Sequence, residues 1–408
     1  MGTNWEFEDL ERTLKDFEFT RKAIRDINSV VYSAKFEEMD SATIFTYLYQ
    51  NLETVSFKDY LKRYIYAHAG IQERYTEVPE EVYREILAYS FDENGAPFSF
   101  GPTSKKKNAI IKGWLSQENV KRSTIFLLGF GLRMSREDVT EFLTKVIREE
   151  DFNILDPEEA VFLYCFKNGL RYAEAKAFLD KYEKFGEADE VKSGEVARIQ
   201  EMIRDKKFEI NTADDMQVYL KVLKKLLIHN NRENTAYQEF MSLVDRSRQI
   251  IADMYNEDIE ETGGRRRTKD SITYGDIEKV ICSGIPLTKS GNLQKMSYSV
   301  LKNHFRQKRM SRQRLDDVSA KKIRVDRFDI ITLSFFICSQ EQSELEPEIR
   351  LRNYLKDTNE VLDKCSMMRL YPVNPYEAFV LMCLLSDSPL TTYSDIWEMS
   401  YSTGEENA

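Results

Sequence analysis

The chain has 408 residues, of which 42% are apolar and 31% charged, and this balance predicts a soluble globular protein of two to three domains. With only 16 Gly and 9 Pro, the chain is poor in the turn-forming residues that an all-β fold requires. The net charge of −10 argues against a protein that coats nucleic acid over its whole surface.

Apolar residues recur with helical periodicity almost everywhere, and no segment alternates with the period of two that strands show, so the sequence predicts an all-α fold built from helical hairpins. Residues 91–103 contain Gly and Pro and are predicted to form a loop. Residues 256–269 change from acidic to basic across two glycines and are predicted to form a linker. The predicted helices are, in chain order, residues 7–34 (one or two helices), 41–52, 57–68, a helix opening at Pro79, 104–115, 193 to about 206, 216–228 and 236–255.

Several features predict a cytoplasmic protein without a membrane partner. The longest apolar run, residues 330–338, is interrupted by Thr332 and Ser334 and is too short to span a bilayer. The N-terminus lacks the basic start and apolar stretch of a secretory signal. The five scattered cysteines form no CxxC pair and predict reduced, buried thiols.

The chain contains an internal duplication. Residues 156–165 (DPEEAVFLYC) match residues 374–383 (NPYEAFVLMC), and both stretches open with a helix-capping residue followed by Pro. Upstream, residues 122–130 parallel 327–335, and residues 141–145 parallel 360–364. We therefore predict that residues of about 104–183 and 311–402 are two copies of a four-to-five-helix module. The turns at residues 131–134 and 168–170 are predicted helix C-caps within the first copy.

This organisation predicts five segments. They are N-terminal helices (1–103), a first helical module (104–206), a helical connector (207–262), a basic linker and helix (263–310) and the second copy (311–408). Each copy has an Arg at a helix start, where a cation opposes the helix dipole, and a Glu in the next helix. We predict the ion pairs Arg122–Glu141 and Arg327–Glu360.

The patterns typical of catalytic and metal sites are not found. The three histidines have no second His at i+3 or i+4, and there is no G-x-S-x-G motif. Residues 284–290 (GIPLTKS) are one residue too short for a phosphate loop. We therefore predict no catalytic residue, no metal ligand and no cofactor.

Residues 105–116 (KKKNAIIKGWLS), Lys121-Arg122, residues 131–134 and residues 139–143 together resemble the second half of phage-repressor-type helix-turn-helix domains. The resemblance covers about 40 residues and implies that the start of a recognition helix enters the major groove. It places Lys105, Lys106, Lys107 and Asn108 against nucleic acid. The loop at residues 91–103 departs from the tight turn of that family. The C-terminal stretch resembles a group of uncharacterised proteins from gut Firmicutes, which implies a bacterial origin.

Basic residues are concentrated in one part of the chain, where residues 265–327 hold 17 Lys and Arg against six Asp and Glu. Such a segment can bind a polyanion locally, and Tyr298 and Phe305 are available for stacking on bases. The residues predicted to contact phosphates here are Lys302, Arg306, Lys308, Arg309, Arg312, Arg314, Lys321, Lys322 and Arg324.

Two interpretations remain open. The first is a non-catalytic regulatory protein that binds DNA or RNA through its basic helices. The second is a helical adaptor that binds another protein, because stacked hairpins often present a concave binding face and the chain is acidic overall. Burial of residues 265–327 against acidic helices would favour the adaptor, and an exposed basic face would favour nucleic acid.

Overall fold

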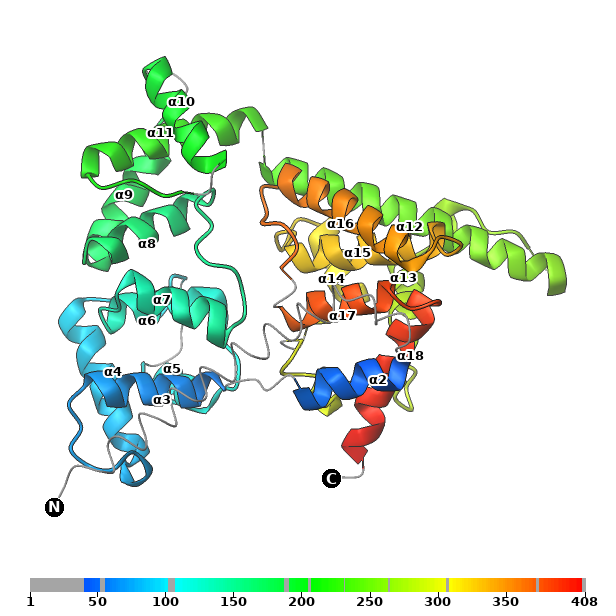
Figure 1. Cartoon of the computed structure of the whole chain (residues 1–408), viewed down its shortest axis with the longest axis horizontal. Coiled ribbons are helices and arrows are strands. Elements are labelled where there is room, and N and C mark those ends of the chain that lie inside the picture. The colour runs from blue at the N-terminus through cyan, green and yellow to red at the C-terminus, as the bar shows by residue number, and fades with distance from the viewer. Residues whose placement is uncertain are drawn as a thin grey trace. The chain divides into compact units, whose positions relative to one another are not determined.

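The computed structural model confirms the all-α fold: its elements are helices, apart from one isolated antiparallel bridge between Leu287 and Leu293. The structure describes residues 40–51, 56–101, 107–186, 191–204, 207–230, 232–262, 265–305, 308–371 and 374–405. The predicted helix at residues 7–34 lies outside this part of the chain. The chain divides into two compact units, and each is described by itself (Figure 1).

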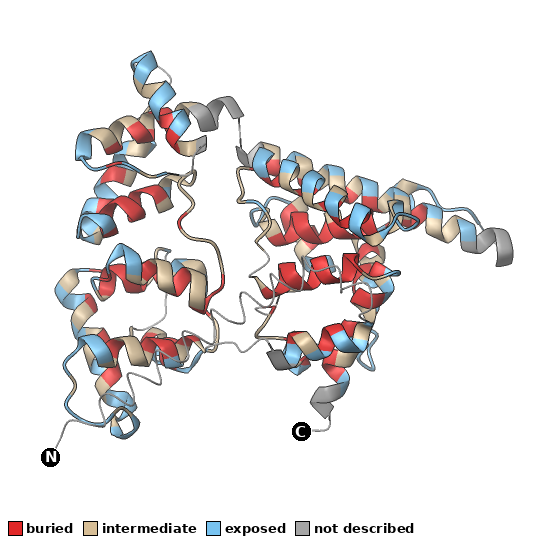
Figure 2. Cartoon of the chain, viewed as in Figure 1, coloured by how far each residue is buried: buried red, intermediate tan, exposed pale blue. Residues whose placement is uncertain are grey.

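The first unit is formed by residues 56–230 and has its core around α8, in which residues 160–166 are all buried (Figure 2). Asp156 caps this helix by accepting the backbone N–H groups of Glu158 and Glu159, as the capping pattern predicts. The unit contains α3 (Phe57–His68), a 3-10 turn (Tyr75–Glu77), α4 (Glu80–Asn94), α5 (Lys107–Ser116), α6 (Arg122–Gly131), α7 (Arg136–Glu141), a π-helical segment (Phe142–Val146), α8 (Pro157–Lys167), α9 (Tyr172–Lys184), α10 (Ser193–Arg204) and α11 (Ala213–Asn230).

The second unit combines residues 40–51 with the described residues from 232 onward, and α17 forms its centre because every residue of that helix is buried (Figure 2). A helix that is apolar all round is stable only inside a core. The unit contains α2 (Ser41–Thr46), a π-helical segment (Tyr47–Asn51), α12 (Arg232–Thr262), 3-10 turns (Lys269–Ser271 and Met296–Tyr298), α13 (Tyr274–Ile281), α14 (Arg312–Ser319), α15 (Arg327–Glu341), α16 (Pro347–Lys364), α17 (Pro375–Leu384) and α18 (Pro389–Glu405).

Two predicted connections are shorter than expected, because helices extend into them. The predicted linker at residues 256–269 is helical as far as Thr262, the end of α12. The predicted loop at residues 91–103 starts only at Gly95, whose left-handed backbone (φ 61°) ends α4. The predicted helix at residues 104–115 begins at Lys107 in the described part of the chain.

The predicted turn at residues 131–134 does end α6, but Gly131 itself has a packing role. It is the last residue of α6, and the left-handed residue that follows that helix is Arg133 (φ 51°). A Cβ atom on Gly131 would overlap the ring of Phe91 on α4. Gly131 therefore allows α4 and α6 to approach closely, whereas Gly169 (φ 62°) is a left-handed glycine at the end of α8, as predicted.

A buried arginine network ties together the first unit. The Arg122 guanidinium, at the start of α6, makes two parallel hydrogen bonds of 2.7 Å to the carboxylate of Glu159 on α8. It also donates to the backbone carbonyls of Glu150 and Asp151 at 2.7 and 2.8 Å. The Glu159 carboxylate accepts the backbone N–H of Asn153 at 2.7 Å. Bidentate geometry and charge make these bonds strong.

The second unit contains the same five hydrogen bonds, whereas the ion pair of Arg122 with Glu149, at 3.6 Å, occurs only in the first. Arg327, at the start of α15, donates to the Glu377 carboxylate on α17 at 2.8 and 2.9 Å. It donates to the carbonyls of Met368 and Arg369 at 2.7 and 3.0 Å. Glu377 accepts the backbone N–H of Tyr371 at 2.6 Å. All five positions correspond to those of the first network in the duplicated sequence, so the likeness supports the predicted duplication.

The predicted ion-pair partners, Glu141 and Glu360, are therefore wrong. Glu141 accepts the Tyr60 hydroxyl at 3.0 Å and pairs with Lys145, and Glu360 is exposed on α16. Helical side chains lean toward the N-terminus of their helix. An arginine at a helix start consequently reaches back to the segment that leads into α8 in the first unit and into α17 in the second.

One helix turn accounts for a local difference of one residue between the two units, in the short stretch that follows Lys145 in the first and Lys364 in the second. In the first copy, the N–H of Glu149 bonds to the carbonyl of Leu143, six residues back, across the π-helical segment after α7. In the second copy, the N–H of Met367 bonds to Leu362, five residues back. A π-turn accommodates one extra residue in a helix. The chain therefore reaches the same carbonyl positions for the arginine in both units.

We expect Glu377→Gln to lower the free energy of unfolding by about 3 kcal/mol, because it leaves a largely buried guanidinium, 20% exposed, without its counter-charge. Glu159→Gln should cost less, since the side chain of Glu377 is 4% exposed and that of Glu159 is 15% exposed. Urea unfolding followed by tryptophan fluorescence measures both losses.

Glu360→Gln is the matched control and should stay within about 0.5 kcal/mol of the parent, as exposed surface changes do. A double-mutant cycle of Glu377→Gln with Arg327→Met should give a coupling of about 1–3 kcal/mol. Additive losses would contradict the network.

Candidate nucleic-acid interface

The structure describes only two of the four predicted contacts in the first unit. Lys105 and Lys106 lie outside the described residues. Lys107, the first residue of α5, pairs with Asp92 on α4, and Asn108 is exposed. The resemblance of this region to helix-turn-helix domains stays a prediction.

The most basic stretch of the sequence is partly neutralised by acidic side chains of the same unit. Arg314 pairs with Asp329 and, at 3.0 Å, with Asp326, and the Lys308 ammonium lies 3.3 Å from Asp326. Burial opposes ionisation of Asp326, but Lys308 and Arg314 outweigh it, and the pKa of Asp326 lies below its ordinary value. Burial and the neighbouring Asp326 raise the pKa of Asp329. Lys308 and Arg314 therefore stabilise the fold. Counting Lys and Arg in the sequence could not reveal this, because the count does not show which cations have acidic partners.

Other predicted contacts remain at the surface around α14. Lys322 lies 3.4 Å from Asp317, and the Lys321 ammonium lies 4.4 Å from the centre of the Tyr237 ring. Arg306 lies outside the described residues, and the Arg309 guanidinium donates to the backbone carbonyl of Gln294. The exposed members of the predicted set in this unit are Arg312, Lys321, Lys322 and Arg324.

Residues 282–311 join α13 to α14, and we call this segment the basic loop; Arg306 and Gln307 within it lie outside the described residues. It contains six Lys and Arg and no Asp or Glu, and the acid-free sequence extends from Lys279 to Leu315. Lys289 and Lys295 are exposed, and neither makes an ion pair within the described part of the chain. The prediction omitted these two lysines because it ranked segments by their density of basic residues. The absence of acidic residues is the signal that would have found them.

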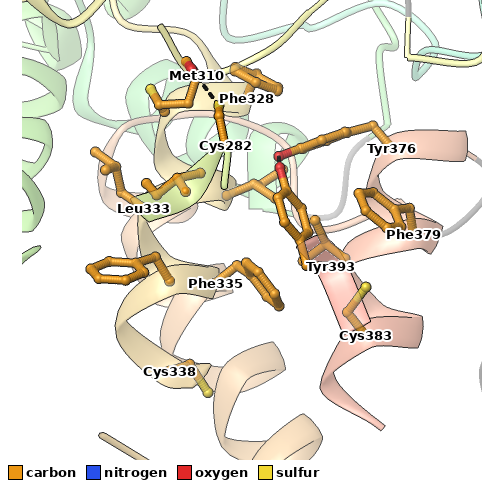
Figure 3. Close-up of a cluster of buried hydrophobic side chains, with 14 of the residues drawn as sticks. Cys282, Met310, Phe328, Leu333, Phe335, Cys338, Tyr376, Phe379, Cys383 and Tyr393 are labelled. Carbon is orange, nitrogen blue, oxygen red and sulfur yellow. Dashed lines mark hydrogen bonds between the residues drawn. The ribbon is translucent and has the colours of Figure 1, made fainter. Parts of the chain in front are cut away.

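The two ends of the basic loop meet in the core of the second unit. The Cys282 thiol donates to the carbonyl of Met310 at 2.9 Å, drawn as the dashed line beside Phe328 in Figure 3. Close to this point, a Cβ atom on Gly284 would overlap the backbone carbonyl of Ser394 on α18. The loop therefore leaves and re-enters the core at one place, and its first turn lies directly against α18.

The middle of the basic loop is also attached to α18. The N–H of Val300 donates to the carbonyl of Ser400 at 2.9 Å, and the hydroxyls of Ser299 and Ser400 are hydrogen-bonded at 2.9 Å. Phe305, predicted as a stacking residue, is 2% exposed and packs 5.0 Å from the ring centre of Phe379. Phe305 is thus a core residue, because the loop turns it inward, whereas Tyr298 is exposed.

The cysteines are buried and form no disulfide, as predicted. Burial raises the pKa of the Cys165, Cys282, Cys338 and Cys365 thiols to about 12, and that of Cys383 well above its ordinary value. Among the described residues, no group of three or more His, Cys, Asp or Glu side chains could hold a metal ion. No helix in that part of the chain has the length and apolarity of a bilayer span.

Comparison with protein-family models, curated proteins and solved structures finds no match to this chain.

We expect Gly284→Ala to destabilise the protein by about 1–3 kcal/mol, because the added methyl group forces the basic loop away from α18. Gly275→Ala is the control within the same unit, since its Cβ would make only ordinary contacts, of 3.5 Å or longer. The control should leave stability unchanged or slightly raised, as Ala is the better helix former. Thermal unfolding measures both, and equal effects would contradict the close contact at Gly284.

Proposed function

We propose that this chain is a non-catalytic nucleic-acid-binding protein that contacts phosphates through the basic loop of its second unit. The observation that carries the proposal is the acid-free sequence from Lys279 to Leu315, held on a folded scaffold with Lys289 and Lys295 exposed. Phosphate contacts by Lys and Arg supply most of the sequence-independent affinity for nucleic acids. An acid-free segment can supply them although the whole chain carries a net charge of −10.

The proposal distinguishes basic residues that pair with acidic side chains of the fold from basic residues that do not. Arg314, Arg327 and Lys308 have acidic partners within the fold and contribute to its stability. Lys289 and Lys295 have no such partners among the described residues, so they add positive potential at the surface. The proposed contact surface is therefore smaller than the predicted one and lies earlier in the chain.

We expect the purified protein to bind a fluorescein-labelled 20-nucleotide strand, with an affinity that falls steeply as salt rises. The triple variant Lys289→Gln, Lys295→Gln, Lys302→Gln should bind more weakly and lower the slope of log K against log salt by about 2, since each phosphate contact contributes about 0.7 on a single strand. Fluorescence anisotropy between about 50 and 200 mM salt measures both quantities.

The matched control replaces Lys112, Lys176 and Lys184, three exposed lysines of the first unit, with Gln. It changes the net charge by the same amount and should bind like the parent. Equal losses in the two triple variants would contradict a defined surface, and no binding at low salt would remove the proposed function.

An adaptor that binds another protein is the second candidate, and the turn between α15 and α16 favours it. Leu345 and Ile349 are exposed large apolar side chains there. Glu344, Glu346 and Glu348 beside them are also exposed. Such a surface suits a basic amphipathic partner. An adaptor would keep its partner in the Lys289, Lys295, Lys302 variant and lose it in a Leu345→Ser, Ile349→Ser variant.

A further inference from the structure

Tyr298 is a large aromatic side chain that the fold leaves in water. It is 65% exposed, whereas Phe305, seven residues later in the same loop, is 2% exposed. The loop thus buries one of its two aromatic side chains and presents the other. Tyr298 also lies in the acid-free sequence, between Lys295 and Lys302.

The backbone that carries Tyr298 is fixed on both sides. Tyr298 ends a 3-10 turn, and its N–H donates to the carbonyl of Lys295 at 3.1 Å. Met296 is buried and accepts the Tyr401 hydroxyl at 3.6 Å. Ser299 is buried and hydrogen-bonded to α18. A backbone that is already fixed loses little conformational freedom on binding, which favours affinity.

Positive charge lies next to this ring. The Lys302 ammonium donates to the carbonyl of Ser297, the residue before Tyr298, at 3.1 Å. Lys295 is exposed at the start of the 3-10 turn. A ligand that covers the ring therefore meets the Lys302 ammonium close to it, and Lys295 lies three residues before Tyr298 in the sequence. The combination of an exposed aromatic face and flanking cations fits an unpaired base with its adjoining phosphates.

We propose that the basic loop binds single-stranded nucleic acid, with one base stacked on Tyr298 and the neighbouring phosphates held by Lys295 and Lys302. This inference rests on the proposed function. Bases in a duplex are stacked on one another and offer no free face, so a stacking tyrosine selects unpaired strands. The face of the ring, and not its hydroxyl, makes the contact. Every base has a π-face, so the site tolerates any sequence.

Tyr89 provides a matched control within the same chain. It is 68% exposed on α4, but its neighbours one turn away on the helix are the acidic residues Glu85 and Glu93. An exposed tyrosine among carboxylates repels a phosphate backbone. Loss of the Tyr89 ring should therefore not change binding.

The test compares the full-length parent with Tyr298→Ala, Tyr298→Phe and Tyr89→Ala, using a labelled 20-nucleotide DNA strand and the duplex of the same sequence. Tyr298→Ala should weaken binding of the single strand about 10-fold, the size of effect seen for stacked bases, and leave duplex binding unchanged. Tyr298→Phe and Tyr89→Ala should bind like the parent. Circular dichroism checks that every variant is folded.

A second readout reports the stacking itself. A strand with 2-aminopurine in place of adenine should lose fluorescence when it binds the parent, because stacking quenches this base, and should lose less when it binds Tyr298→Ala. Equal affinity of the parent for duplex and single strand would overturn the inference, as would a Tyr298→Phe variant as weak as Tyr298→Ala. In either case, salt-dependent binding that is lost in the lysine variant would leave the proposed function standing. Absence of any binding would remove both.

Discussion

The bond between a helix-start arginine and a glutamate two helices later is the constraint around which each unit is organised. A cation at that position opposes the dipole of its own helix, and the glutamate opposite supplies the compensating charge. The same guanidinium satisfies backbone carbonyls that would otherwise lie unpaired in the segment leading into the third helix. One side chain thereby fixes the distance between two helices and the path of the loop between them. The basic loop, with Tyr298, packs against the core of the second unit, which the Arg327–Glu377 pair stabilises.

The helices could be predicted from the sequence, because apolar periodicity and capping residues are local signals. The start of α8 at an Asp-Pro pair and that of α17 at an Asn-Pro pair follow from two adjacent residues. The partner of Arg122 could not be predicted in the same way. Its choice depends on where the side chain leans in three dimensions, and the nearer Glu141 in sequence is engaged by Tyr60 and Lys145.

The candidate site was predicted less well than the fold, for a related reason. Counting Lys and Arg locates a basic region, but it does not separate cations that have acidic partners from those that have none. Arg314 and Lys308 have acidic partners, because the fold brings Asp329 and Asp326, at the start of α15, next to them. The fates of Tyr298 and Phe305 differ although both are aromatic residues of one irregular loop. In an irregular loop, buried and exposed residues do not alternate with a fixed spacing in the sequence. The path of the backbone alone determines which aromatic side chain is buried.

The π-turn after α7 also bears on the history of the two units. A helix that absorbs one added residue without moving its far end preserves the register of everything downstream. The first unit has one extra residue in the π-helical segment, and the end of α16 has no such residue. Arg122 nevertheless pairs with Glu159 as Arg327 pairs with Glu377. An alignment of the two halves therefore needs a one-residue gap at this turn, although the gap falls in a helix and not in a connecting loop. The two units thus differ in length within a helix and still make the same distant contact.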